Sequence, residues 1–286
     1  MEFISLLETQ YWLFITTTTV IGLSVGSFLN VVIHRVPIML ENGWRSECHS
    51  FLKIEHEQEN VEPVNLLKPA SSCPSCGHKI RFWENIPVIS YMLLKGKCSK
   101  CSAHISFQYP AVELFTAITS VAVAMQYGVS VQTLFALFLT WSLISLAVID
   151  AKTQLLPDNI TLPLLWLGLL VNMFGVYTDL QSAVLGAVFG YMVLWTVYKL
   201  FKLITGKEGM GYGDFKLLAA LGAWMGWQML PQIILLSSLV GAVIGIAMIA
   251  VRGHDKNIPI PFGPYLAIAG WIAFIWGEQI NRYWLG

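Results

Sequence analysis

Two aspartates stand at the ends of long apolar stretches, where a carboxylate is costly to place. Asp214 belongs to the glycine-rich run Glu208-Gly-Met-Gly-Tyr-Gly-Asp-Phe-Lys216, and Asp150 follows the apolar residues 141–149. Removing a carboxylate charge from water costs several kcal/mol, so each aspartate needs a partner or a function. If the helices bring the two carboxyls together, the pair can share a proton and activate water, as in an aspartic protease. We therefore predict that Asp150 and Asp214 are a catalytic pair.

Helix capping is the competing explanation for these acidic residues. Asp150 is expected at the C-terminal end of a helix, where the helix dipole disfavours a carboxylate, so capping does not explain it. Asp158 follows Leu-Pro and precedes an apolar stretch, and we predict that it is an N-cap. Asp214 also precedes an apolar stretch, so an N-cap role stays open for it.

The surroundings of Asp214 favour a functional role over capping. The alternating glycines Gly209, Gly211 and Gly213 allow unusual backbone angles and the close approach of another segment. The apolar stretch at residues 215–230 would be roughly 24 Å long as a helix, against roughly 30 Å for the hydrocarbon core of a bilayer. We therefore expect Asp214 below the membrane surface, in a pocket that water can reach.

Four of the five cysteines form two C-x-x-C pairs, namely Cys73, Cys76, Cys98 and Cys101. Each C-x-x-C turn presents two thiolates to one point, and tetrahedral zinc takes four such ligands. Two disulfides or a redox pair are the alternatives, although disulfides are disfavoured in the cytoplasm. We predict a zinc site here and a free thiol at Cys48.

The composition is that of a membrane protein. The chain is 56% hydrophobic and 12% charged, against about 25% charged residues in a soluble domain. The apolar runs are long and do not alternate with polar residues, which favours helices over a barrel. We predict an all-α polytopic membrane protein with about eight transmembrane helices, at residues 11–33, 110–127, 131–149, 160–177, 180–202, 215–230, 232–251 and 262–280. The lipid bilayer is therefore an expected partner, whereas the zero net charge gives no reason to expect nucleic acid.

The predicted spans divide the chain into three parts. Residues 1–33 form a first transmembrane helix, residues 34–109 a cytoplasmic loop with the zinc site, and residues 110–286 a transmembrane bundle. With this loop in the cytoplasm, Arg282 is the one basic residue left on the outer side. The same orientation places both termini outside and both aspartates at the cytoplasmic face.

The first span carries small residues at helical spacing, which favour close helix packing: Gly22, Gly26 and Ser27. Asn30 and His34 either accompany this packing or line a polar cavity. Glu113, just inside the second span, either reaches the membrane surface or faces a cavity, and the sequence leaves both open. The Glu-rich residues 41–63 match no motif.

Five motifs in this order resemble those of the bacterial type IV prepilin peptidases, which are leader peptidase/N-methyltransferases of the G-x-G-D aspartic protease class. They are Gly26-Ser-Phe-Leu-Asn30, the two C-x-x-C pairs, Asp150-Ala-Lys-Thr-Gln-Leu-Leu-Pro-Asp158, Gly211-Tyr-Gly-Asp214-Phe-Lys216 and Pro261-Phe-Gly-Pro-Tyr265. The resemblance covers nearly the whole chain. It is specific because the cysteine pairs and the two aspartate motifs occur together.

The resemblance implies a bacterial inner-membrane enzyme with two activities. One is an aspartic endopeptidase that removes the basic leader of type IV prepilins and pseudopilins on the cytoplasmic side. The other is N-methylation of the new N-terminal residue with S-adenosylmethionine. The family's catalytic pair carries over onto Asp150 and Asp214 and its tetracysteine site onto the two C-x-x-C pairs. The methyl-transfer residues stay unassigned, because the chain has no Rossmann-type glycine fingerprint.

An ion- or proton-coupled transporter with a cytoplasmic zinc module is the alternative function. Intramembrane acids serve ion coupling in such proteins. Against it, the spans show no inverted repeat and no regularly spaced polar residues along several helices. A membrane scaffold held together by the zinc loop would leave Asp150 unexplained.

Overall fold

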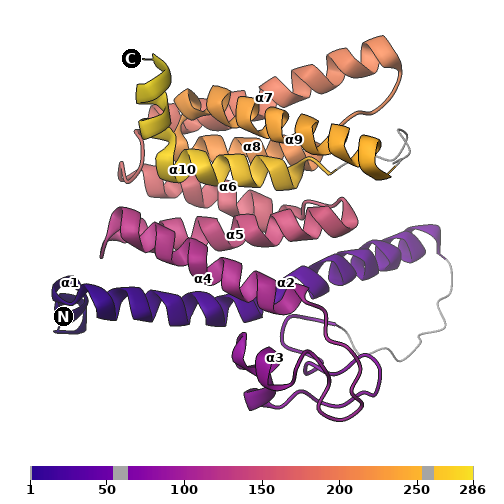
Figure 1. The fold of residues 1–286 in the computed structure, drawn as a ribbon. Coiled ribbons are helices and arrows are strands. Elements are labelled where there is room, and N and C mark those ends of the chain that lie inside the picture. Colours follow the sequence, from indigo (N-terminus) through magenta and orange to yellow (C-terminus); the bar gives the residue numbers. More distant parts are fainter. Residues whose placement is uncertain (1, 54–63, 253–260, 286) are drawn as a thin grey trace. The chain divides into compact units, whose positions relative to one another are not determined.

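The computed structural model describes residues 2–53, 64–252 and 261–285, and its regular elements are helices (Figure 1). Two isolated antiparallel bridges, Ser72 with Lys79 and Lys97 with His104, occur in the cysteine region. The chain divides into two compact units, Met1–Thr133 and Leu134–Gly286. The all-α prediction is confirmed.

The first unit is built on the pairing of two long helices. Its elements are α1 (Glu2–Thr9), α2 (Tyr11–Leu52), the 3₁₀ helix η1 (Phe82–Asn85), α3 (Ile89–Leu93) and α4 (Gln108–Tyr127). A Cβ atom on Gly22 would lie 2.8 Å from Ala117 Cα, and one on Gly26 would lie 2.7 Å from Glu113 Cα. Small residues on α2 therefore let α4 approach closely, which confirms the expected helix packing.

The first helix is longer than the sequence pattern indicates. The apolar residues end near Ile33, but α2 continues through Pro37 to Leu52, and most of its last turns are solvent-exposed. Hydropathy marks where apolar side chains stop, whereas Met, Leu, Glu and Arg continue a helix in water. The loop expected from residue 34 therefore begins after α2. Of the insert at residues 41–63, residues 54–63 lie outside the described residues.

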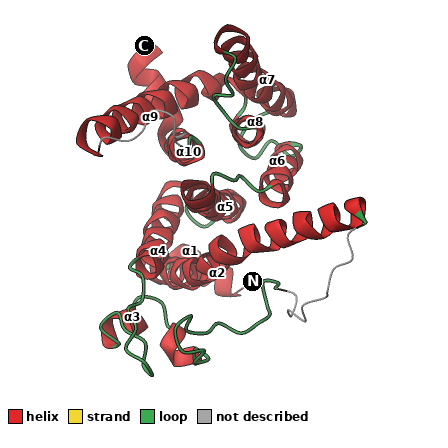
Figure 2. Cartoon of the chain, turned by 90° about the vertical axis from the view of Figure 1, so that its right-hand side faces the viewer, coloured by secondary structure: helices red, strands yellow, loops and turns green. Residues whose placement is uncertain are grey.

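In the second unit, the other helices pack around one short, buried helix. The elements of this unit are α5 (Val131–Thr153, whose first turn belongs to the first unit), α6 (Asp158–Asn172), α7 (Leu180–Thr205), α8 (Tyr212–Met225), η2 (Trp227–Met229), α9 (Leu230–Arg252) and α10 (Gly263–Leu285). Figure 2 shows α8 among α6, α7 and α10. The Trp224 indole Nε1 donates to Leu164 O at 2.9 Å, and Asn172 Nδ2 donates to Ala223 O at 2.9 Å, which ties α6 to α8. Because its neighbours cover α8 on several sides, it is apolar nearly all round.

Four helical segments of the described residues are long and apolar enough to cross a membrane: Tyr11–Leu52, Val131–Thr153, Leu180–Thr205 and Trp227–Ala247. The other four predicted spans overlap α4, α6, α8 and α10, but those at 160–177 and 215–230 run past the ends of α6 and α8, and eight spans are not confirmed. With 15 and 14 residues, α6 and α8 are shorter than the roughly 20 residues of a full span.

Candidate active site and metal centre

Asp150 lies in the last turn of α5 and is held by the first residue of α10. The side chain is buried, and the Gly263 backbone N–H donates to Asp150 Oδ2 at 3.0 Å. A Cβ atom on Gly263 would lie 2.6 Å from the same oxygen, so only glycine lets α10 approach this closely. In the sequence, Gly263 stands out only as part of the motif Pro261-Phe-Gly-Pro-Tyr265. The motif does not predict its contact with Asp150.

Asp214 is the third residue of α8. The N-cap is Gly211, so Asp214 is not the N-cap; its carboxylate instead accepts the Gly211 backbone N–H from the third helical position, as in one half of a capping box. The Asp214 side chain is buried, and the charge of Asp150 acts on it. The fold thus places two carboxyls that are far apart in the sequence within range of each other's charge.

Leu156 separates the starts of α8 and α10 beside the two acids. Its Cβ lies 2.7 Å from the position of a Cβ on Gly213, and its Cδ1 lies 3.2 Å from that of a Cβ on Gly263. The close approach expected at the glycine-rich run is therefore present. The unusual backbone angles are not, because Gly209, Gly211 and Gly213 are absent from the residues with positive φ.

Asp158 is not the N-cap of α6, which corrects that prediction. Pro157 occupies the cap position without a side-chain hydrogen bond, and Asp158 is the first helical residue. Its two carboxylate oxygens each lie 2.7 Å from Lys216 Nζ on α8. Asp158 therefore joins the starts of α6 and α8 through a lysine that lies two residues after Asp214.

We expect this ion pair to contribute little to stability. The Asp158 side chain is 54% exposed and that of Lys216 28%. Such pairs contribute about 0.2–1 kcal/mol. Asp158→Ala, Lys216→Ala and the double variant, compared by thermal unfolding in detergent, should give a coupling free energy in this range and keep part of the peptidase activity that the sequence predicts. Complete inactivity of folded Asp158→Ala would mean that Asp158 belongs to the catalytic pair.

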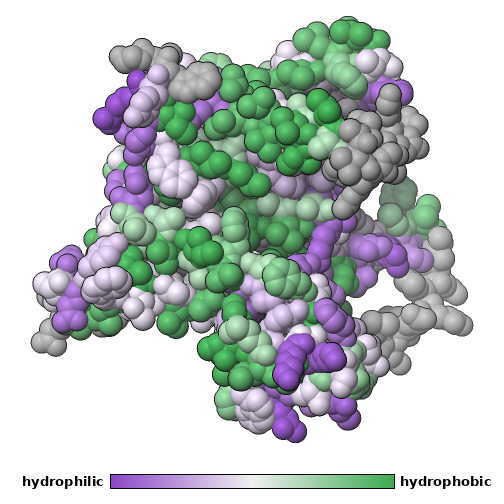
Figure 3. All heavy atoms as spheres, in the orientation of Figure 1, coloured by the Kyte–Doolittle hydropathy of each residue, from purple (hydrophilic) through white to green (hydrophobic). Residues whose placement is uncertain are grey.

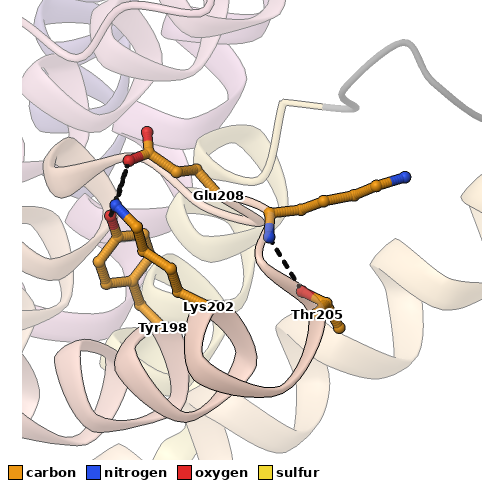
Figure 4. Close-up of polar contacts among 5 residues, drawn as sticks. Tyr198, Lys202, Thr205 and Glu208 are labelled. Carbon is orange, nitrogen blue, oxygen red and sulfur yellow. Dashed lines mark hydrogen bonds and ion pairs between the residues drawn. The ribbon is translucent and has the colours of Figure 1, made fainter.

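The glycine-rich turn is fastened to the end of α7 through Glu208 (Figure 4). Lys202 Nζ lies 2.6 Å from Glu208 Oε1, and the Tyr198 hydroxyl donates to the same oxygen at 3.3 Å. This hydrogen bond from Lys202 lowers the pKa of Glu208. The Tyr198 ring is buried and lies 5.5 Å from the Tyr212 ring on α8. The segment that carries Asp214 is therefore held at both ends.

The four paired cysteines converge on one point, as predicted: the sulfur atoms of Cys73, Cys76, Cys98 and Cys101 all lie within 4.8 Å of one another. All four are free thiols, as is the exposed Cys48. Each C-x-x-C turn is closed by its own backbone hydrogen bond, from Cys73 N to His78 O at 2.9 Å and from Cys98 N to Ala103 O at 2.8 Å. Four convergent sulfur donors fit a tetrahedral zinc ion.

Backbone N–H groups within the turns favour the thiolate form that a metal needs. Those of Ser75 and Cys76 lower the pKa of Cys73 to about 6. The Ala103 N–H acts in the same direction on Cys101, but the three neighbouring thiols and burial raise the pKa of Cys101 to about 12. The cluster therefore combines sulfur atoms of different proton affinity around one centre.

Glu84 connects the two cysteine turns. Its Oε2 accepts the backbone N–H of Arg81 at 2.9 Å and lies 3.2 Å from His78 Nε2, next to the first turn. The side chain of Ser99, in the second turn, also hydrogen-bonds to it. These contacts, chiefly the Arg81 N–H, lower the pKa of Glu84 to about 2. The cysteine spacing alone did not reveal this link between the two turns.

Replacing any one cysteine of the cluster with Ser should lower the zinc content of the purified protein. Zinc binding to a four-thiolate site supplies folding free energy, so the loop should also become more sensitive to protease. Elemental analysis and limited proteolysis measure the two effects, with Cys48→Ser as the control that leaves both unchanged. Wild-type protein without zinc would refute the assignment.

The three polar residues whose roles the sequence left open are now placed. Glu113 faces the loop, where its buried carboxylate accepts the Val88 backbone N–H at 2.7 Å. Asn30 is buried between α2 and α4 and donates from Nδ2 to Tyr109 O at 3.1 Å, which supports packing. His34 is exposed. No sequence pattern predicts the hydrogen bond that Glu113 accepts, because its donor is a backbone N–H.

Comparison with known proteins assigns the chain to a family. Residues 20–127 match the bacterial peptidase A24 N-terminal domain, and residues 137–246 match the type IV leader peptidase family. A prepilin leader peptidase/N-methyltransferase of Pseudomonas aeruginosa is 57% identical over 95% of this chain and 93% of its own length. The chain belongs to the type IV leader peptidase family. Proteins of the same description from Aeromonas hydrophila and Neisseria gonorrhoeae are 57% and 51% identical, over 96% and 93% of this chain and 94% and 93% of their own lengths. No solved structure matches.

The two family matches fall in different units of the molecule. The peptidase A24 N-terminal match lies within the first unit, with the cysteine cluster, and the leader peptidase match lies within the second, with both aspartates. The protein is a multi-pass membrane protein of a bacterial family. The transporter alternative is therefore set aside.

Proposed function

We propose that this protein is a prepilin leader peptidase and N-methyltransferase. It removes the basic leader of type IV prepilins or pseudopilins at the cytoplasmic face of the bacterial inner membrane. It then methylates the new N-terminal residue with S-adenosylmethionine. The observation that carries the peptidase half is the buried pair Asp150 and Asp214, each held by a backbone N–H at the start of a helix. The names of the relatives support both halves.

The peptidase mechanism uses the two acids as one unit. Two neighbouring carboxyls cannot both ionise without mutual repulsion, so they hold one proton between them. The ionised aspartate takes a proton from water, and the protonated one donates to the scissile carbonyl oxygen. The Gly263 N–H keeps Asp150 Oδ2 from rotating away from this geometry. No covalent intermediate is required.

The proposed topology has eight spans, with both termini outside and residues 34–109, which comprise the end of α2 and the cysteine loop, in the cytoplasm. A prepilin resembles a basic leader followed by one apolar helix. The leader therefore stays in the cytoplasm while the helix enters the bilayer beside the enzyme. This places the scissile bond at the depth of the two acids. Residues 110–286 form the peptidase bundle.

Zinc and S-adenosylmethionine are the proposed cofactors. Cys73, Cys76, Cys98 and Cys101 would hold the zinc ion, whose role there is to fold the loop. S-adenosylmethionine supplies the methyl group. We propose that the cysteine loop and the ends of the first spans, the largest soluble surface of the chain, provide its site.

Two substrates test this function in one reconstituted preparation. The first peptide carries a basic leader and an apolar helix, and the second is the same peptide without its leader. We expect cleavage of the first and transfer of labelled methyl from S-adenosylmethionine to the second. Absence of cleavage by active-site-intact protein in bilayers would refute the peptidase, and absence of label would refute the methyltransferase.

A further inference from the structure

The cysteine region of the first unit carries an exposed apolar patch. It comprises Phe82, Trp83, Ile86, Ile89, Met92 and Leu93, on η1, α3 and the turn between them. Phe82 and Leu93 are 81% and 77% exposed. Figure 3 shows hydrophobic side chains over this part of the molecule, with hydrophilic ones beside them. Large apolar side chains exposed side by side are typical of a surface that contacts a membrane or another molecule.

A hydrogen bond to the pair of helices α2 and α4 fixes the level of the patch along the axis of α2. Val88, between η1 and α3, donates its N–H to Glu113 of α4 at 2.7 Å, and the Ser27 side chain of α2 hydrogen-bonds to the same carboxylate. Ser27 lies within the apolar part of α2, a candidate span. Arg35, the first charged residue after it, is roughly 12 Å further along the axis at 1.5 Å per residue. The start of α3 therefore lies below the level at which α2 becomes charged.

The backbone at Val88 indicates that this placement is specific. Val88 has φ +60° and ψ −47°, and Ile89 N donates to Pro87 O at 2.6 Å, which makes a γ-turn. A β-branched residue with positive φ is strained and persists only where its surroundings fix it. The Glu113 carboxylate supplies that fixation. The turn thus holds α3 beside the α2–α4 pair.

The charges around the patch are those of a segment at a lipid surface. Arg81 lies over the Trp83 ring at 5.3 Å, and Lys95 and Lys97 follow α3. The acid of this stretch, Glu84, is turned inward onto His78 and the Arg81 backbone. Aromatic residues with basic neighbours are typical of the membrane interface, where the rings enter the acyl boundary and the cations meet lipid phosphates.

We propose that Phe82–Leu93 is a membrane-docking segment: η1 and α3 lie in the interface of the bilayer that α2 crosses, with the apolar patch facing the acyl chains. The metal centre is thereby held against the membrane surface on one side. A pilin peptide or a second copy of this chain is the competing occupant. The bilayer is favoured because the Glu113 bond places the patch beside the apolar part of a span.

Lipid photolabelling of the full-length protein tests this docking. The protein is reconstituted in phosphatidylcholine vesicles that contain a phospholipid with a diazirine near the glycerol end of its acyl chain. After irradiation, adducts are mapped by mass spectrometry on the peptide containing residues 82–97. The variant Phe82→Ser/Leu93→Ser is compared with Leu67→Ser, which changes an 87% exposed leucine outside the patch. Peptides from α5 serve as the positive control.

We expect lipid adducts on residues 82–97 in the wild type and in Leu67→Ser, and an adduct yield about tenfold lower in the double variant. Replacing one third of the phosphatidylcholine with phosphatidylglycerol should raise the yield. A wild-type protein labelled on α5 but not on residues 82–97 would overturn the proposal. So would a double variant labelled as strongly as the wild type, or crosslinks from the patch to a pilin peptide or a second chain in place of lipid.

Discussion

Asp150→Asn and Asp214→Asn should each lower the rate of leader cleavage by at least about a thousandfold, because each removes one half of the proposed proton-sharing pair. Asn has nearly the shape of Asp, so the buried contacts around both positions stay filled. In Asp150→Asn the amide oxygen can still accept the Gly263 N–H, but an amide in either position cannot exchange the proton. The measurement is kcat for cleavage of a full-length prepilin in vesicles.

Two controls separate loss of chemistry from loss of fold. Asp158→Asn, which changes an acid at the neighbouring helix start, should keep most of the activity. Both variants should still methylate a peptide without leader, because we place the methyl-transfer site on the cysteine loop, and this loop and the two acids belong to different units. Cleavage at the wild-type rate by either variant would refute the pair. Loss of methylation in folded Asp150→Asn and Asp214→Asn would mean that one site serves both reactions.

Gly263→Ala should lower kcat by about a hundredfold, although the residue carries no reactive group. The new Cβ would lie 2.6 Å from Asp150 Oδ2, so the carboxylate or the start of α10 must move. A displacement of about 1 Å at a catalytic group costs on the order of a hundredfold in rate. KM should change little, because the contact is with Asp150 rather than with the leader.

Gly270→Ala is the matched control on the same helix. Its Cβ would lie 2.5 Å from Leu221 Cδ1, an apolar contact away from both acids. Overpacking of this kind costs about 1–3 kcal/mol of stability. We therefore expect a lower unfolding temperature in Gly270→Ala with wild-type kcat per folded molecule. Equal kcat in Gly263→Ala and wild type would show that the Gly263 contact does not position Asp150.

The sequence alone determined the features that depend on local spacing. A C-x-x-C turn places two thiolates within one turn of backbone, so the four-cysteine cluster followed from residue types and intervals. Long apolar runs specified helices, because a backbone in lipid must satisfy its own hydrogen bonds. The helix dipole argument excluded capping at Asp150. Continuation of α2 beyond Ile33 escaped prediction because helical hydrogen bonding persists where hydropathy ends.

Only the tertiary structure decided which distant groups meet. Gly263 is more than a hundred residues from the Asp150 carboxylate that it holds, and Lys216 holds Asp158 from another helix. The Glu113 carboxylate accepts the backbone N–H of Val88, and the γ-turn at Val88 makes this N–H available to it. These contacts depend on how closely two helices pack, which a missing Cβ allows, and on how far a side chain reaches. Neither the place of a close approach nor the reach of a side chain follows a periodicity along the chain. The sequence therefore identified the two acids, whereas the contact of α10 with Asp150 on α5 and the burial of Asp214 on α8 placed them.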